Sequence, residues 1–122
     1  MTATIKTVAV IGGGLMGHGI ALEFALHGFS VYLQSRSQES LVRSHSMVET
    51  SAKLLVDLGK TTEGNTSNIV EQIKFTTSLE AATSDANFII ESIYENLDLK
   101  RGLFRKLDTL AGSDAILASN TS

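Results

Sequence analysis

Three glycines near the amino terminus have the spacing Gly-x-Gly-x-x-Gly and follow a run of apolar, largely β-branched residues. This pattern is typical of a turn that binds the pyrophosphate of a dinucleotide. Gly12 lets the chain turn sharply out of a strand, Gly14 lets the phosphates approach the backbone, and Gly17 lets the next helix pack closely on the strand. The N–H groups at the start of that helix would donate hydrogen bonds to the phosphates. We therefore expect cofactor contacts at Gly12, Gly14, Leu15, Met16 and Gly17, and a structural turn without a ligand is the alternative.

The residues after the second apolar run, 30–34, bear on which dinucleotide is bound. In such nucleotide sites a carboxylate at this position accepts hydrogen bonds from the ribose hydroxyls of NAD. This chain has Ser35 and Arg36 instead, and a neutral serine beside a guanidinium would accommodate the 2′-phosphate of NADP. The alternative is that Ser35 or Ser37 caps the next helix beside a solvated arginine, and both interpretations stay open.

Glu91 stands in the apolar run 88–93, near the carboxyl end of a predicted strand. Open α/β sheets bind ligands at that edge, so a carboxylate there is a candidate for a functional role. The alternative is a partly exposed residue at the end of the strand.

The three histidines of the chain are candidates for acid–base chemistry. His18 and His27 lie near the two ends of the first predicted helix, and we interpret both as surface or capping residues rather than catalysts. His45 falls on the apolar stripe of a later helix, and we interpret it as a packing or half-buried residue rather than a ligand.

Strand and helix patterns alternate along the chain. Strands are predicted at 8–11, 30–34, 73–77, 88–93 and 115–119. Helices are predicted at 15–27, 41–55, 78–85 and after 97. Gly28 and Gly59 would end the first two, and Ser78 would cap the third. A loop or short helical turn is predicted at 60–68. Strands joined by helical crossovers predict an α/β fold, a Rossmann-type doubly wound parallel sheet in strand order 3-2-1-4-5 with helices on both faces.

Composition limits the class of protein further. The 122 residues are enough for one domain, 1–122, with 43% hydrophobic residues and a net charge of −3. No basic run predicts a nucleic-acid partner, and no apolar stretch approaches the ~20 residues that cross a membrane. The absence of cysteine excludes disulfides, thiolate catalysis and cysteine-bound metals, and we expect no metal site. A cytoplasmic location fits this composition, with an organelle matrix as the alternative.

Motifs along the chain resemble those of a known family. Segments 8–19, 90–101 and 115–122 together resemble the amino-terminal NAD-binding domain of L-3-hydroxyacyl-CoA dehydrogenases, and the similarity runs along essentially the whole chain. The most specific motifs are Glu-Asn-Leu-x-x-Lys, from Glu95 to Lys100, and the terminal Ala-Ser-Asn-Thr-Ser. The resemblance implies an oxidoreductase of fatty acid metabolism that transfers hydride between an L-3-hydroxyacyl-CoA and NAD.

The resemblance also implies roles for particular residues. Glu95 and Lys100 match family residues that contact the cofactor, and Ser122 matches the serine that hydrogen-bonds the 3-oxygen of the substrate near the nicotinamide. The family also contacts coenzyme A through a serine and nearby lysines in the long helix region. The matching candidates here are Ser51 with Lys53 or Lys60.

This sequence departs from the family pattern in two ways. The family's acidic residue at the end of the second strand falls at Ser35. This chain ends at the Ser-Asn-Thr-Ser motif. In the family this motif is followed by the catalytic histidine, its partner glutamate, a later asparagine and the helical domain for dimerisation. We therefore expect the cofactor half of a dehydrogenase, inactive alone, whose full-length parent is a homodimer through the second domain. The alternatives are a β-hydroxyacid dehydrogenase that acts on a free hydroxy acid, and a non-catalytic nucleotide-sensing module.

Overall fold

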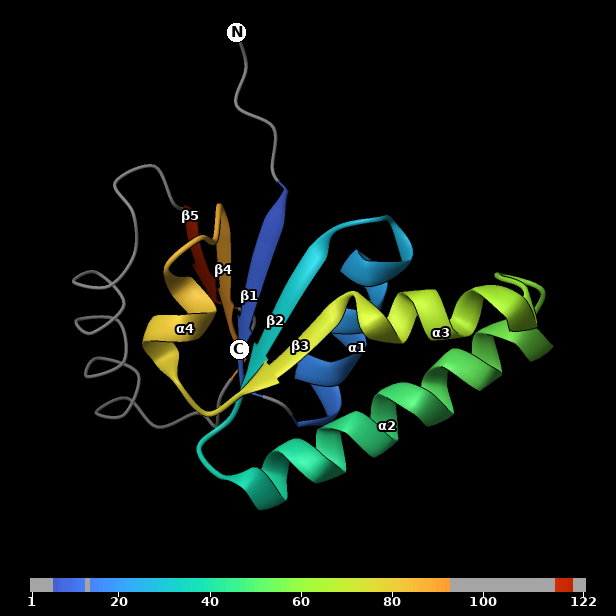
Figure 1. Ribbon diagram of the computed structural model, residues 1–122, viewed down its shortest axis with the longest axis horizontal. Helices are drawn as coiled ribbons and strands as arrows, with labels where there is room; N and C mark the ends of the chain where they lie inside the picture. The colour runs from blue at the N-terminus through green and yellow to red at the C-terminus, as the bar shows by residue number, and fades with distance from the viewer. Residues whose placement is uncertain (1–5, 13, 93–115, 120–122) are drawn as a thin grey trace, which may run out of the picture.

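Within the described residues, five parallel strands form a central sheet (Figure 1). The computed structural model describes residues 6–12, 14–92 and 116–119. The strands are β1 (Thr7–Ile11), β2 (Ser30–Gln34), β3 (Ile73–Thr76), β4 (Phe88–Glu91) and β5 (Ile116–Ser119). They pair in the order β3-β2-β1-β4-β5, which confirms the order predicted from the sequence.

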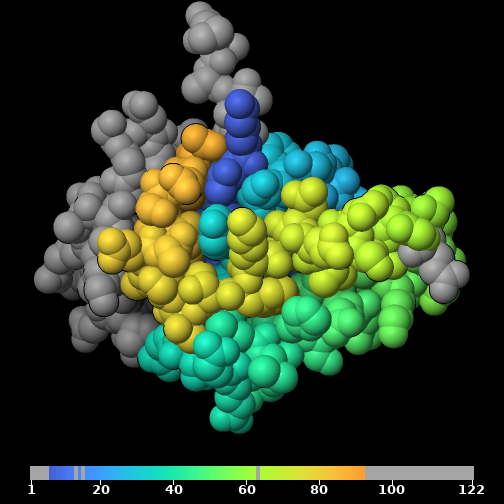
Figure 2. Space-filling model, in the orientation of Figure 1, coloured from blue at the N-terminus to red at the C-terminus, as the bar shows by residue number. Residues whose placement is uncertain are grey.

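Helices cover both faces of the sheet, as predicted. The helices α1 (Leu15–Leu26), α2 (Gln38–Asp57) and α3 (Glu63–Glu71) lie on one face, and α4 (Leu79–Thr83) lies on the other (Figure 1). Helices α2 and α3 pack against each other and extend beyond the sheet to one side (Figure 2). None of the helices in the described ranges is both long and apolar enough to cross a membrane.

The central strand β1 is buried on both faces. Val8 and Val10 belong to the apolar core on the side of α1, while Ala9 and Ile11 pack on the opposite side with Ala82 of α4. These four of the five β1 residues are no more than 1% exposed. A strand buried on both faces cannot alternate apolar and polar residues, which explains the continuous apolar run.

The segment after α2 differs from its prediction. A loop or short helical turn was expected at 60–68, but α3 runs from Glu63 to Glu71. Ile69 is 3% exposed in the core, Val70 packs against the same core, and α3 contacts both α1 and α2. Packing against these neighbours stabilises a helix whose polar sequence gives little signal of its own.

The predicted helix ends are confirmed by their capping contacts. The Ser78 side chain accepts a hydrogen bond from the Ala81 N–H (3.0 Å). Gly28 and Gly59 follow α1 and α2 with φ of 90° and 73°, in the left-handed region that glycine adopts without strain. His27 is the exposed C-cap of α1, and its Nδ1 lies 2.9 Å from the Glu23 carbonyl oxygen.

Helix α1 comes close to the residue that follows β1 at Gly17. A Cβ atom at this position would lie 1.8 Å from the Gly12 carbonyl oxygen and 2.9 Å from its carbon. Both neighbouring atoms belong to the backbone, so no side-chain rotation would relieve the clash. Gly19, two residues further along the same helix, has no atom within 4 Å of an added Cβ.

We expect Gly17→Ala to lower the free energy of unfolding by about 1–3 kcal/mol or more, because the turn or the helix must move to admit a methyl group. Gly19→Ala is the matched control, and it should be neutral or stabilise by up to about 1 kcal/mol through helix propensity. Urea denaturation followed by circular dichroism measures both variants. Equal stability of the two variants would contradict the close approach at Gly17.

Candidate dinucleotide-binding site

The glycine turn (Gly12, Gly14 and Gly17) lies where the strand order of the sheet reverses. Strand β1 has β2 on one side and β4 on the other, and the turn follows its carboxyl end. The Gly12 N–H donates to the Gln34 carbonyl oxygen at 2.8 Å, and the Ser92 N–H donates to the Ile11 carbonyl oxygen at 2.7 Å. Such a reversal opens a crevice at the carboxyl edge of a parallel sheet, where dinucleotides bind.

Each glycine of the turn has the local geometry that its predicted role needs. Gly12 has φ of 105°, so the sharp turn out of β1 uses the left-handed region. Gly14 is exposed, and an added Cβ there would meet no atom within 4 Å. The space beside the Gly14 backbone is therefore open to a pyrophosphate. Gly17 provides the close packing of α1 described above.

The first turn of α1 is not capped by a side chain. The N-cap residue of α1 is Gly14, which has no side chain to accept a hydrogen bond from the first turn, whereas serines cap α2 and α4. Leu15 begins the helix, and Met16 is 59% exposed in the same turn. Backbone donors and the positive end of the helix dipole therefore face the open side of the turn, which suits an anionic group.

The carboxyl end of β2 carries the residues expected to bear on cofactor choice. Ser35 is half-buried, and its N–H donates to the Thr76 carbonyl oxygen at 3.2 Å. Arg36 is exposed, and its guanidinium forms no hydrogen bond, ion pair or ring contact with another described residue. Ser37 accepts a hydrogen bond from the Ser40 N–H at 3.1 Å, so the predicted cap of α2 is Ser37 rather than Ser35.

Gln34 is a polar residue of this edge that the sequence interpretation did not single out. Its side chain is 6% exposed, and its Nε2 donates to the carbonyl oxygens of Ser35 (3.2 Å) and Thr77 (3.0 Å). Gln34 therefore fixes the segments that follow β2 and β3. The available signal was a polar residue at the end of an otherwise apolar strand.

Glu91 is fully buried at the carboxyl end of β4, with 0% exposure. It pairs in register with Ile11 of β1 and Ser119 of β5. The alternative interpretation of Glu91 as a partly exposed strand-end residue is therefore wrong.

His18 is not the surface or capping residue that the sequence suggested. Its side chain is 6% exposed, its Nδ1 lies 3.3 Å from the Gly14 carbonyl oxygen, and its Nε2 lies 3.1 Å from Ser51 Oγ. Helices α1 and α2 pack against each other, and Ser51 of α2 contacts the ring. Local spacing within α1 carries no signal of a contact made 33 residues along the chain.

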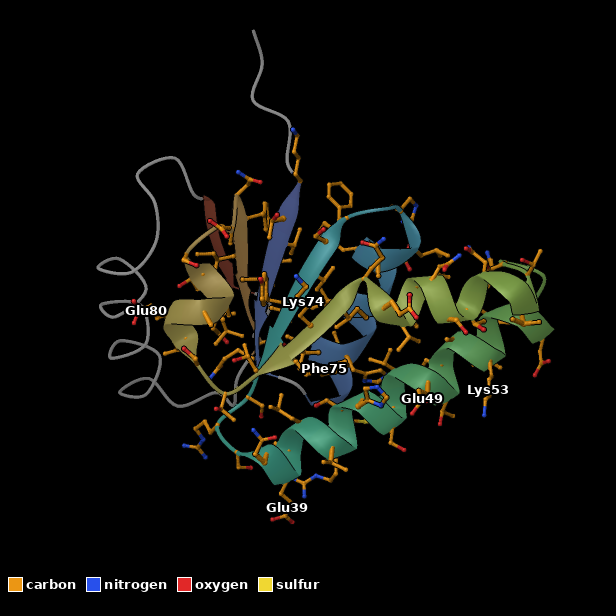
Figure 3. All side chains as sticks on the ribbon, in the orientation of Figure 1. Glu39, Glu49, Lys53, Lys74, Phe75 and Glu80 are labelled. Atoms are coloured by element: carbon orange, nitrogen blue, oxygen red, sulfur yellow. The ribbon has the colours of Figure 1, made fainter. Side chains whose placement is uncertain are left out.

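Ser51 and Lys53 lie on different faces of α2. Ser51 contacts α1 through His18, whereas Lys53 lines a groove of about 390 Å³ between α2 and α3. Glu49 also lines this groove, and Figure 3 shows that both residues belong to α2. Lys60 is exposed beyond the end of α2. The structure therefore does not bring the coenzyme A candidates together on one face.

His45 lies beside the same groove but is exposed, so of the predicted packing or half-buried role only the packing contact is found. Its Nδ1 lies 3.0 Å from Glu49 Oε1, and its ring centroid lies 5.0 Å from that of Phe75. In the described part of the chain, no group of three histidine or acidic side chains could hold a metal ion. Glu95, Lys100 and Ser122 lie outside the described residues, so their roles stay predictions.

Comparison with known proteins identifies the family. Residues 7–122 match the family described as 3-hydroxyacyl-CoA dehydrogenase, NAD binding domain. The chain belongs to this family. As a domain of the 3-hydroxyacyl-CoA dehydrogenases it is an NAD-binding domain, and the glycine turn at the strand-order reversal is the feature that suits this cofactor.

Individual relatives agree with this assignment. The chain is 35% identical to the mitochondrial hydroxyacyl-coenzyme A dehydrogenase of Rattus norvegicus, over 97% of this chain and 39% of that protein. It is 36% identical to the 3-hydroxybutyryl-CoA dehydrogenase of Clostridioides difficile, over 94% of this chain and 41% of that protein. A diketoreductase of known structure is 31% identical with a TM-score of 0.95, over 99% of this chain and 43% of that one. The chain thus spans about two fifths of the length of these three relatives.

We expect Gly14→Val to keep the fold and weaken the binding of NADH at least tenfold. Gly14 has φ of −71° and open space beside it, so valine fits the free protein but occupies the place of the pyrophosphate. Calorimetry or NADH fluorescence measures the affinity, and Gly19→Ala serves as the control for a changed helix residue. A folded Gly14→Val protein with the affinity of the unchanged chain would show that no phosphate lies against Gly14.

Proposed function

We propose that this chain is the cofactor half of a dehydrogenase that transfers hydride between an L-3-hydroxyacyl-CoA and NAD in fatty acid metabolism. The observation that carries the proposal is the open glycine turn before an uncapped helix, at the reversal of strand order in a domain of this family. The nicotinamide ring, when bound, supplies the hydride chemistry. The residues of this domain hold and orient the dinucleotide, which is the protein's share of such a reaction.

The site residues beyond the glycine turn are supported by the family resemblance. We assign Glu95 and Lys100 to the cofactor, and Ser122 to the 3-oxygen of the substrate. Ser51 is the better supported contact for coenzyme A, because it lies one helix away from the glycine turn and bonds a residue of α1. Lys53 faces the groove with α3, so only the resemblance supports it.

The parent protein is proposed to contain a second, helical domain through which it forms a homodimer. The support is the family resemblance together with the share of each relative that this chain spans. The proposed location is the cytoplasm, on the basis of composition. The rat relative is named mitochondrial and an Arabidopsis thaliana relative is named peroxisomal, so an organelle matrix stays the alternative.

None of the three histidines is placed as a general base for the substrate hydroxyl. His18 is held between Gly14 and Ser51, His27 caps the far end of α1, and His45 pairs with Glu49. A general base must lie within hydrogen-bond reach of the proton that it abstracts. The family's histidine follows the Ser-Asn-Thr-Ser motif, as the resemblance implies.

We therefore expect residues 1–122 to bind NADH but to show no turnover of acetoacetyl-CoA. The assay follows the absorbance of reduced nicotinamide with NADH and with NADPH, and calorimetry measures NADH binding to the same preparation. Turnover above the background without protein would contradict this expectation, and His18 would then be the residue to replace first.

We also propose that NADP(H) binds at least as well as NAD(H). Ser35 has no charge to repel a 2′-phosphate, and the exposed Arg36 guanidinium forms no hydrogen bond or ion pair with another described residue. A well-formed hydrogen bond between a guanidinium and a phosphate contributes roughly 1.5–3 kcal/mol, or about one to two decades of affinity. Ser35 also lacks the carboxylate that would accept hydrogen bonds from the ribose hydroxyls of NAD.

Arg36→Ala should weaken NADP(H) binding by about tenfold or more and leave NAD(H) binding unchanged. Ser35→Asp should shift the preference toward NAD(H). Arg43→Ala is the matched control, because Arg43 lies on α2 nearby and is paired with Glu39. A tenfold preference of the unchanged chain for NAD(H), together with no effect of Arg36→Ala, would make Arg36 a solvated surface residue.

A β-hydroxyacid dehydrogenase acting on a substrate without coenzyme A is the second candidate. The similarity to a diketoreductase, an enzyme that acts on dicarbonyl compounds, favours this class over a nucleotide sensor. Binding of acetoacetate but not of acetoacetyl-CoA would identify it. A parent reading frame near about 300 residues would favour either dehydrogenase over the sensor.

A further inference from the structure

Ser51 is oriented differently from its neighbours on α2. The Ser44 and Thr50 hydroxyls donate to the carbonyl oxygens of Ser40 and Ser46, four residues earlier in the helix. The Ser51 hydroxyl instead lies 3.1 Å from His18 Nε2, which is its hydrogen-bond partner among the described residues. A contact outside the helix therefore decides which way this hydroxyl points.

The other ring nitrogen of His18 determines the direction of that hydrogen bond. His18 Nδ1 lies 3.3 Å from the Gly14 carbonyl oxygen, which can only accept. Nδ1 therefore carries the proton of the neutral ring, and Nε2 keeps a lone pair. The Ser51 hydroxyl then donates to Nε2, and its own lone pairs remain for a donor group of a ligand.

We propose that His18 is a positioning residue that orients the Ser51 hydroxyl and links it to the glycine turn. The inference rests on the proposed function in one respect, which is the contact of Ser51 with the acyl-CoA substrate. The same ring touches the carbonyl of the turn that receives the cofactor and the hydroxyl on the substrate side. His18 thus orients the Ser51 hydroxyl oxygen as a hydrogen-bond acceptor for the substrate. An amide N–H of the pantetheine chain of coenzyme A is one donor of this kind.

Two substitutions separate the two hydrogen bonds of the ring. His18→Gln places an amide near the position of Nε2, so it can still accept from Ser51. His18→Asn places an amide near the position of Nδ1, so it can still donate to Gly14 but does not reach Ser51. If His18 only filled space, the folded His18→Gln and His18→Asn variants would bind the substrate with the same affinity.

The binding test is a titration of the 122-residue chain with acetoacetyl-CoA in saturating NAD, followed by amide chemical shifts. We expect Ser51→Ala and His18→Asn each to weaken acetoacetyl-CoA binding by about threefold to tenfold, as for the loss of one hydrogen bond. His18→Gln should stay within about twofold of the unchanged chain. In the Ser51→Ala background His18→Asn should have no further effect, since the two changes remove the same interaction.

The outcomes distinguish the inference from the function on which it rests. If Ser51→Ala leaves acetoacetyl-CoA binding unchanged, the proposed substrate role of Ser51 is wrong. If Ser51→Ala weakens binding while His18→Asn matches His18→Gln, the positioning role of His18 is wrong and the function stands. His27→Asn is the control for a changed histidine, because His27 is exposed at the far end of α1.

A spectroscopic measurement tests the hydrogen-bond direction without any substitution. Long-range proton–nitrogen correlation spectra of the imidazole rings distinguish the two tautomers of a neutral histidine. At about pH 8.5, above the ordinary range of histidine titration, we expect His18 as the Nδ1–H tautomer. A ring with its proton on Nε2 would overturn the inference, because Ser51 would then be the acceptor.

Discussion

The close approach of α1 to the end of β1 is the constraint on which the site depends. The Gly12 carbonyl oxygen lies where any side chain at Gly17 would begin. Because the helix can come this near, its first turn is aimed over the carboxyl edge of the sheet. The left-handed φ of Gly12 is the other half of the same constraint, since the chain must reverse within a few residues of leaving a fully buried strand.

The strands beside the glycine turn hold its first residue in place. Backbone hydrogen bonds join Gly12 to Gln34 and Ser35 to Thr76. The carboxyl end of β1 is therefore bonded to that of β2, and the end of β2 to that of β3. The Gln34 side chain adds two further bonds across the same edge. These hydrogen bonds fix the strand ends before a dinucleotide binds, so that part of the site loses little conformational entropy on binding and more of the contact energy appears as affinity.

The features predicted well from the sequence are those fixed by short-range or whole-strand constraints. The buried strands and their order follow from continuous apolar runs and crossover handedness, and the helix ends follow from Gly28, Gly59 and Ser78. The errors at α3 and His18 share one cause, which is contact between segments distant in sequence. Helix α3 depends on packing against α1 and α2, and the burial of His18 depends on its contact with α2. Periodicity within one segment carries no information about such neighbours.

The His18–Ser51 hydrogen bond contributes more to register than to stability. The residues that bury the α1–α2 interface elsewhere are apolar or small, including Ala21 and Ala25 of α1 and Val48 and Ala52 of α2. Small apolar surfaces pack in more than one relative position at similar cost, whereas a hydrogen bond is directional. Burying a histidine and a hydroxyl costs desolvation, so the net gain is only about 0.5–1.5 kcal/mol. The His18–Ser51 pair therefore fixes which turn of α2 lies beside the start of α1. It thereby sets the position of a substrate bound by α2 relative to a cofactor bound by the glycine turn.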